Sequence, residues 1–206
     1  MLDLEKQYYS EKVKYIAGTD EAGRGCLLGP VVIAAVILPP DFYDESINDS
    51  KKMSEKQREA AFELIQKNAL DITVTIIEPE EIDRINILEA SRLGMETCLK
   101  KLTHEYQFAL TDAVKLKKYD RPYDAIIKGD AKALCIAAAS IIAKVTRDRI
   151  CIELDKKYPI YNIRNNKGYG TKDHMDALKT YGPVRGLHRF SYKPVKNAQF
   201  QEISLF

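Results

Sequence analysis

Four acidic residues have the type and placement expected of ligands for a divalent metal ion. Asp20 and Glu21 are adjacent, and Asp112 and Asp130 follow much later in the chain. Carboxylates that lie close together raise one another's pKa, and a cation relieves their repulsion. All-oxygen ligands favour Mg²⁺ or Mn²⁺, and two such ions about 4 Å apart can activate water and stabilise the leaving oxygen of a phosphate ester. The four residues therefore indicate metal-dependent phosphoryl-transfer chemistry.

The same residues also have ordinary structural interpretations. Residues 19–25, Thr-Asp-Glu-Ala-Gly-Arg-Gly, could form a surface turn, since Asp, Glu and Gly all favour loops. Asp112 could be a loop residue that satisfies local backbone amides, and Asp130 could be the N-cap of a helix that starts at Ala131. Both interpretations stay open at this point.

The acidic residues follow segments that are expected to be β-strands. Apolar and β-branched residues predict strands at 15–18, 31–38, 70–77, 106–110 and 125–127. Helices are predicted from Ser54, with Gln57 completing a capping box, to about residue 68, and at 87–103 and 131–157. The acidic residues then stand at three strand ends, so adjacent strands would bring them together. This order of elements predicts an α/β fold with a mixed sheet.

Length and composition predict one domain with a substantial core. The chain has 206 residues, of which 45% are hydrophobic, and we expect a core at 1–158 followed by a basic helical portion at 159–206. No apolar run approaches the roughly 18 residues of a membrane helix, and the N-terminus lacks the layout of a signal peptide. A cytoplasmic protein without membrane contact is expected. The four cysteines have no metal-binding spacing and are expected to be buried thiols.

Charge is divided unevenly along the chain. Residues 1–112 contain 13 basic and 21 acidic residues, whereas residues 113–206 contain 19 basic and 9 acidic residues. Basic side chains alternate with aromatic ones near the C-terminus, which suits a nucleic-acid surface or, alternatively, an ordinary solvated surface. The residues concerned are Arg164, Lys167, Tyr169, Lys172, Lys179, Tyr181, Arg185, Arg189, Phe190, Tyr192, Lys193 and Lys196.

These motifs together resemble the prokaryotic ribonuclease HII family, the type 2 ribonucleases H. The resemblance extends from about residue 14 to residue 196. It is carried by residues 18–25 (Gly-Thr-Asp-Glu-Ala-Gly-Arg-Gly), 48–52 (Asn-Asp-Ser-Lys-Lys), 54–56, 81–83, 86–87, 128–130, 137–148, 167–171 (Lys-Gly-Tyr-Gly-Thr), 188–189 and 191. Residues 18–25 and the stretch from 128 to 148 are the most specific of these segments.

The resemblance implies a ribonuclease H-like fold with a five-stranded mixed sheet flanked by helices, plus a helical C-terminal portion. It implies an endoribonuclease that cleaves the RNA strand of RNA/DNA hybrids and serves ribonucleotide excision repair. Duplex DNA would be cut on the 5′ side of an embedded ribonucleotide, leaving 3′-hydroxyl and 5′-phosphate ends. A monomer is expected.

The family's functional residues can be carried onto this sequence by motif. Asp20, Glu21, Asp112 and Asp130 resemble the four catalytic carboxylates that bind two Mg²⁺ or Mn²⁺ ions. Gly23, Arg24 and Gly25 match the segment that reads the 2′-hydroxyl, and Tyr169 matches the tyrosine that assists at the ribose. Independently of the family, the basic side chains of Lys51, Lys52, Lys144 and the C-terminal tail can hold flanking phosphates without reading sequence.

Some residues depart from the family pattern. Cys26 stands where proline is common, Ala113 stands where glycine commonly follows the third carboxylate, and Leu27 and Leu28 replace smaller residues. These departures remove no expected ligand, but they concern the backbone path beside two of the acidic residues.

The last six residues resemble a peptide that docks on a bacterial sliding clamp. Gln201 begins this segment, and Leu205 and Phe206 end it with two apolar side chains that need a surface to cover them. The alternative is that these side chains pack on the protein itself.

Two other functions compete with the leading interpretation. Ribonuclease HIII shares the fold, but that family typically carries an additional N-terminal domain, and only about a dozen residues precede the first predicted strand here. A non-catalytic module that binds hybrids is the second alternative, which the four retained carboxylates oppose.

Overall fold

The computed structural model describes residues 2–201, with side chains described for residues 4–198. Five strands form one mixed sheet in the order β3-β2-β1-β4-β5. Strand β1 runs antiparallel to β2 and parallel to β4, and β4 runs parallel to β5. The five-stranded mixed sheet expected from the sequence is thereby confirmed. The strands are β1 (Ile16–Ala22), β2 (Val31–Ile37), β3 (Asp71–Ile77), β4 (Phe108–Asp112) and β5 (Tyr123–Ile126).

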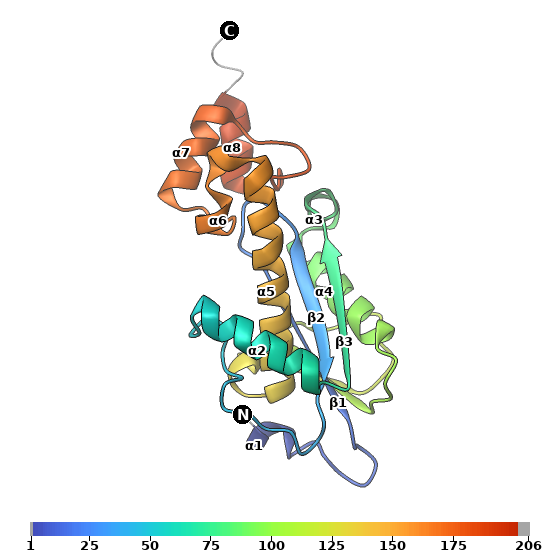
Figure 1. Cartoon of the computed structure of the whole chain (residues 1–206). Helices are drawn as coiled ribbons and strands as arrows, with labels where there is room; N and C mark the ends of the chain where they lie inside the picture. Colours follow the sequence, from blue (N-terminus) through green and yellow to red (C-terminus); the bar gives the residue numbers. More distant parts are fainter. Residues whose placement is uncertain (1, 202–206) are drawn as a thin grey trace. The chain divides into compact units, whose positions relative to one another are not determined.

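Helices connect and follow these strands (Figure 1). The longest is α5 (Leu134–Lys157), and the short helical turn η1 (Gly129–Ala131) precedes it. The others are α1 (Leu2–Glu5), α2 (Glu55–Asn68), α3 (Pro79–Ile85), α4 (Ile87–Lys101), η2 (Pro159–Tyr161), α6 (Ile163–Asn166), α7 (Lys172–Tyr181) and α8 (Lys193–Gln201). None of the helices in residues 2–201 is long and apolar enough to cross a membrane. The expected cytoplasmic location stays a prediction.

The chain forms two compact units, each built from separate segments. The first comprises residues up to Ala22, then Val32–Ile76 and Ser91–Val145, and it contains almost all of the sheet. The second comprises Gly23–Val31, Ile77–Ala90 and the chain from Thr146 onward. The domain boundary predicted after residue 158 remains a prediction.

In the first unit, the two faces of the sheet are covered by different helices. Gly18 lies against the backbone of Cys135 at the start of α5, so a Cβ built on Gly18 would be 2.2 Å from the Cys135 carbonyl carbon. On the other face, Gly94 of α4 lies against Ile33 of β2. Because both faces are buried, every residue of β2 is buried, as its continuous apolar sequence predicts.

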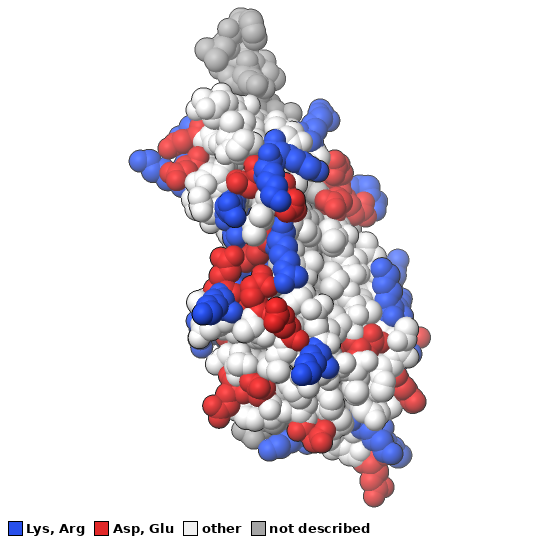
Figure 2. Space-filling view, viewed as in Figure 1, with Lys and Arg blue, Asp and Glu red and all other residues white. Residues whose placement is uncertain are grey.

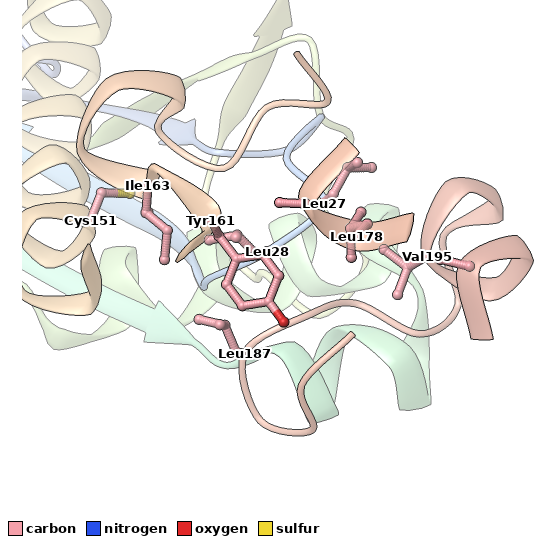
Figure 3. Close-up of a cluster of buried hydrophobic side chains, with 10 residues drawn as sticks. Leu27, Leu28, Cys151, Tyr161, Ile163, Leu178, Leu187 and Val195 are labelled. Atoms are coloured by element: carbon pink, nitrogen blue, oxygen red, sulfur yellow. The ribbon is translucent and has the colours of Figure 1, made fainter. Parts of the chain in front are cut away.

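The second unit has its own apolar core (Figure 3). Tyr161 lies among leucine and isoleucine side chains in this view, and its hydroxyl donates a hydrogen bond to the Gly182 carbonyl at 2.7 Å. The core residues are Leu27, Leu28, Cys151, Tyr161, Ile163, Ala177, Leu178, Leu187, Val195 and Ala198. Leu27 and Leu28, unexpected beside a glycine-rich turn, therefore anchor that turn to a core.

Local signals located most elements, and the errors have simple causes. The capping box of Ser54 and Gln57 is present at the start of α2. The long helix begins at Leu134 rather than at Ala131, because residues 129–131 form the separate turn η1. Asp130 is therefore not the N-cap of this helix, and that interpretation was wrong. Helix α3 was not predicted. All four cysteines are buried thiols, as expected.

Candidate active site

The predicted acidic cluster begins on β1, near the middle of the sheet. Asp20 is buried, and it lies on the same face of the strand as Gly18, since side chains alternate along a strand. Gly18 packs against α5 on this face. The short strand predicted at 15–18 in fact continues to Ala22, so Asp20 and Glu21 are held by strand hydrogen bonds rather than by a loop. The surface-turn interpretation of these two residues was wrong.

Asp112 and Asp130 come from the next two strands of the sheet. Asp112 is the last residue of β4, and the parallel register Thr19↔Thr111 places it beside Asp20. Asp130 lies in η1, shortly after β5, and is buried. Because β1, β4 and β5 are adjacent and parallel, their carboxyl ends meet at one edge of the sheet.

Three of the four predicted ligands come together at this edge. One carboxylate oxygen from each of Asp20, Asp112 and Asp130 lies within 4.8 Å of the other two. Glu21 is not part of this close group. Strand alternation directs its side chain to the opposite face from Asp20, although its charge still acts on Asp20. The role of Glu21 as a metal ligand stays a prediction.

The electrostatics of the group favour a bound cation. Burial raises the pKa of Asp20 well above its ordinary value, and the negative charges of Glu21 and Asp112 raise it further. A hydrogen bond with Ser140 of α5 opposes these effects only in part. The Lys51 ammonium donates to Asp130 at 2.8 Å, and this contact is the leading cause of the raised pKa of Lys51.

The donor set also fits such a cation. Three carboxylates with oxygen donors alone suit Mg²⁺ or Mn²⁺ better than a softer metal. Asp112 contributes to the local backbone as well, because its Oδ1 accepts a hydrogen bond from the Gly129 amide at 2.8 Å. The alternative of a loop residue that satisfies local amides is therefore only partly right, because Asp112 accepts this amide hydrogen bond but is the last residue of β4 and belongs to the acidic group.

The loops that carry Asp112 and Asp130 have unusual backbone conformations. Ala113 has φ +54° and Lys128 has φ +57°, a region that costs energy for residues other than glycine. Ala113 directly follows Asp112, and Lys128 lies two residues before Asp130. Such conformations persist where the surroundings impose them, which is frequent at functional sites.

The second unit contains the glycine-rich segment and the tyrosine predicted to contact the sugar. Gly23 has φ +95°, and a Cβ on it would lie 1.9 Å from Nε of Arg147. Arg24 and Gly25 are exposed, and a Cβ on Gly25 would lie 3.9 Å from the Tyr169 ring. The structure therefore brings Tyr169 next to the glycine-rich segment, although residue 169 is distant in sequence.

Two buried arginines hold these segments together. Arg147 donates to the carbonyl oxygens of Pro30 at 3.0 Å, Leu28 at 3.2 Å and Lys167 at 2.7 Å. Arg189 donates to the carbonyl oxygens of Gly29 and Arg24, both at 3.0 Å. Neither arginine was predicted to do this.

For Arg189 the sequence-based prediction was wrong. It was grouped with the nucleic-acid surface, but its side chain is fully buried. The two residues after Arg189 are held by a residue that is distant in sequence, because Asp83 accepts hydrogen bonds from the Phe190 and Ser191 amides, both at 2.8 Å. One indication of a role for Asp83, Arg147 and Arg189 came from the sequence, because they lie in the segments that match the family. Those segments did not indicate which groups the three side chains contact.

The lysines predicted to contact phosphates have different surroundings. Lys51 is bonded to Asp130, Lys52 is exposed with Asp49 at 3.8 Å, and Lys144 is half-buried on α5. In the view of Figure 2, basic and acidic side chains lie interspersed on the visible face. The hydroxyls of Ser50 and Ser140 form a buried hydrogen bond of 2.9 Å. This contact holds the backbone directly before Lys51 and Lys52 against α5.

Comparison with known proteins agrees with this architecture. A family model described as Ribonuclease HII matches residues 17–195. A ribonuclease HII from Listeria monocytogenes serotype 4b (strain F2365) is 52% identical over 205 residues, covering 100% of this chain and 78% of that protein.

Solved structures are also similar to this chain. The crystal structure of the ribonuclease H2 from Pyrococcus horikoshii OT3 superposes with a TM-score of 0.78 at 28% identity, covering 91% of this chain and 98% of that one. Ribonuclease HII in the PCNA complex from Archaeoglobus fulgidus superposes with a TM-score of 0.73 at 28% identity, covering 89% and 96%. The expected ribonuclease H-like fold with a helical C-terminal part is confirmed.

Proposed function

Because the chain belongs to the ribonuclease HII family of metal-dependent nucleases, which act on RNA/DNA hybrids, we propose that it also incises duplex DNA at embedded ribonucleotides. The cut would fall on the 5′ side of the ribonucleotide and leave 3′-hydroxyl and 5′-phosphate ends. The observation that carries this proposal is the group of Asp20, Asp112 and Asp130 at the ends of adjacent strands.

Asp20, Asp112 and Asp130, together with Glu21, would hold two divalent cations, Mg²⁺ or Mn²⁺. When bound, such ions supply the positive charge that activates water and stabilises the leaving oxygen of a phosphodiester. The sheet fixes the carboxylates before substrate arrives, since two of them lie within adjacent strands. The Lys51 ammonium, which neutralises Asp130 in part, is close enough to this group to contact a phosphate near the cut.

Selection of the ribonucleotide would depend on the segment Gly23–Arg24–Gly25 and on Tyr169. The 2′-hydroxyl is the sugar feature that separates RNA from DNA at one nucleotide, and exposed backbone at Gly25 can approach it closely. Tyr169 is 46% exposed beside Gly25, so its ring is available to pack on the sugar. A sugar without this hydroxyl would leave the phosphate misplaced, which turns recognition into specificity of cleavage. Lys52 and Lys144 would hold flanking phosphates.

An incision assay on matched duplexes tests the proposal. Four substrates of one sequence are needed: all DNA, DNA with one ribonucleotide, DNA with four consecutive ribonucleotides, and a full RNA/DNA hybrid. We expect cleavage 5′ of the single ribonucleotide in Mg²⁺ or Mn²⁺ and none of the all-DNA duplex. Cleavage of the hybrid alone would refute the proposed incision at single ribonucleotides.

Variants separate catalysis from mere binding of hybrids. Asp20→Asn should abolish incision while the protein still binds the duplex, whereas Asp41→Asn, at an exposed position away from the cluster, should retain activity. If wild type and Asp20→Asn bound substrate equally and neither cleaved it, the non-catalytic alternative would be favoured. The ribonuclease HIII alternative is set aside by the family match.

We also propose that residues 201–206 dock on a sliding clamp. The supporting observations are the Gln-initiated, Leu-Phe-terminated sequence and the solved complex of an archaeal ribonuclease HII with PCNA. The segment beyond Gln201 lies outside the described residues. Binding of purified bacterial clamp to the full chain and to a chain without residues 201–206 decides this question, since equal affinity would end the idea.

A further inference from the structure

Two of the three histidines in the chain are buried side by side in the second unit. His174 lies in the first turn of α7, and His188 lies in the segment between α7 and α8. Their Nε2 atoms are 3.4 Å apart, and both side chains are almost completely shielded from solvent. Nothing in the proposed chemistry uses either ring.

The outer nitrogen of each ring has a partner whose hydrogen-bonding role is fixed. The Val184 backbone N–H, which can only donate, lies 3.0 Å from Nδ1 of His188. The Tyr169 carbonyl oxygen, which can only accept, lies 2.9 Å from Nδ1 of His174. These two contacts determine both tautomers.

His188 must accept at Nδ1, so a neutral ring carries its proton on Nε2. His174 must donate from Nδ1, so a neutral ring has its lone pair on Nε2. The Nε2–H of His188 then donates to Nε2 of His174. The direction of every bond is consistent from Val184 to the Tyr169 carbonyl.

We infer that His188 and His174 form a neutral hydrogen-bond chain whose function is to position the Tyr169 loop for the sugar of the substrate. This inference rests on the proposed role of Tyr169. The two histidines are positioning residues, because they act on Tyr169 through its backbone.

The chain ends at a turn that is tightly determined. The Tyr169 carbonyl accepts a second hydrogen bond, from the Thr171 amide at 2.8 Å, and the Tyr169 amide donates to the Asn166 carbonyl at 2.9 Å. Tyr161 packs edge-on against both histidine rings, with centroid distances of 6.2 Å to His174 and 4.7 Å to His188. The rings are therefore held from the side as well as at their ends.

Protonation of either ring would break this arrangement. A cationic His188 would direct Nδ1–H at the Val184 N–H, and a cationic His174 would direct Nε2–H at the Nε2–H of His188. Burial lowers the pKa of both rings, in the case of His188 to about 4, with the neighbouring ring as a further cause. His188 also lines a cavity of about 570 Å³, and the other charged or titratable residues in that lining are Glu80, Asp83 and Arg185.

The sign of the pH effect follows from these lowered pKa values. The unfolded chain takes up protons on these histidines near their ordinary pKa of about 6.5, whereas the folded chain does so only at lower pH. The contribution of the pair to stability is complete above about pH 6.5 and is lost as the pH falls through the folded pKa values.

NMR spectroscopy of the full wild-type chain with ¹⁵N-labelled histidine tests the tautomers directly. Long-range ¹H–¹⁵N correlations should show the Nε2–H tautomer for His188 and the Nδ1–H tautomer for His174 at pH 7. The signals of the third histidine, His104, are those that disappear in His104→Asn. This variant keeps the backbone amide that donates to Asp71. A cationic ring, or the opposite tautomer at either position, would overturn the inference.

Kinetics on the duplex with one ribonucleotide test the effect on Tyr169. His174→Phe removes the donor to Tyr169 and should lower kcat about fivefold with KM nearly unchanged, as expected for one lost hydrogen bond. His174→Asn keeps an amide donor close to the position of Nδ1 and should restore part of the loss. Unchanged kcat in a folded His174→Phe would also overturn the inference, and if this variant does not fold, the NMR result decides. Wild type that shows both tautomers yet does not cut this duplex would refute the proposed function instead.

Discussion

Replacing Ala113 by glycine should stabilise the protein, although it removes a methyl group. Ala113 follows Asp112 directly and has φ +54°. The Val114 amide donates to the Asp112 carbonyl at 2.7 Å, which closes a three-residue turn centred on Ala113. The Ala113 side chain is exposed, so its removal leaves no cavity.

The expected gain follows from two opposing terms. A left-handed conformation costs an L-residue roughly 1–2 kcal/mol, and glycine does not incur this cost. Glycine also makes the unfolded chain more flexible, which lowers stability by about 0.4–1 kcal/mol. The net effect is a gain of about 0.5–1 kcal/mol, which corresponds to a rise in Tm of roughly 1–4 °C for a protein of this size.

Urea and thermal unfolding of Ala113→Gly measure this gain. Ala60→Gly is the matched control, because Ala60 is exposed in the interior of α2 and should lose about 1 kcal/mol. We expect the two glycine variants to differ in sign, and we expect Ala113→Gly to retain nuclease activity because the backbone path beside Asp112 is unchanged. A loss of stability in both variants would refute the reasoning from backbone conformation.

Three further changes have effects that the structure predicts. Asp20→Asn should stabilise the metal-free protein at pH 7 by about 1–3 kcal/mol and should abolish any rise in Tm with Mg²⁺. Because the pKa of Asp20 is raised in the folded state, metal-free wild type loses stability as the pH rises above about 4. The free energies of unfolding of wild type and Asp20→Asn should therefore converge in acid, and a difference that does not change with pH would contradict this reasoning. Gly23→Ala should lose about 2–4 kcal/mol in urea unfolding, since its Cβ would overlap Arg147 at φ +95°, and unchanged stability would contradict the overlap. Arg147→Lys should lose about 2–3 kcal/mol, because one ammonium cannot reach three carbonyl oxygens, and a neutral result would show that these bonds contribute little.

The sheet and its acidic edge could be predicted because their signals are local. The continuous apolar sequence of residues 31–38 predicts a buried strand, and the capping box of Ser54 and Gln57 predicts the start of α2. Asp112 and Asp130 were recognised at strand ends, and parallel strands bring such ends together. The prediction ended the first strand at residue 18, whereas β1 continues to Ala22, and strand alternation then places Glu21 on the opposite face from Asp20.

The buried arginines could not be predicted in this way. An arginine in a basic, aromatic segment has the same local sequence whether it faces phosphate or carbonyl oxygens. Only the fold reveals that Arg189 meets the carbonyls of Gly29 and Arg24, which lie some 160 positions earlier in the chain. The positive φ of Ala113 could not be predicted from the local sequence either, because alanine gives no signal for this conformation. The only indication was that the family commonly has glycine at this position.

The departure at Cys26 has a structural explanation, because Cys26 links the glycine-rich turn to the segment that precedes Tyr169. Its amide donates to the Gly23 carbonyl at 3.3 Å and closes a β-turn with Arg24 and Gly25 at its centre. A proline here would lack this donor, although it would restrict the backbone. The Cys26 thiol donates to the Lys167 carbonyl at 3.4 Å, the same oxygen that Arg147 contacts. Cys26 therefore ties the turn to the segment that leads into Tyr169, and it replaces the rigidity of proline with two hydrogen bonds.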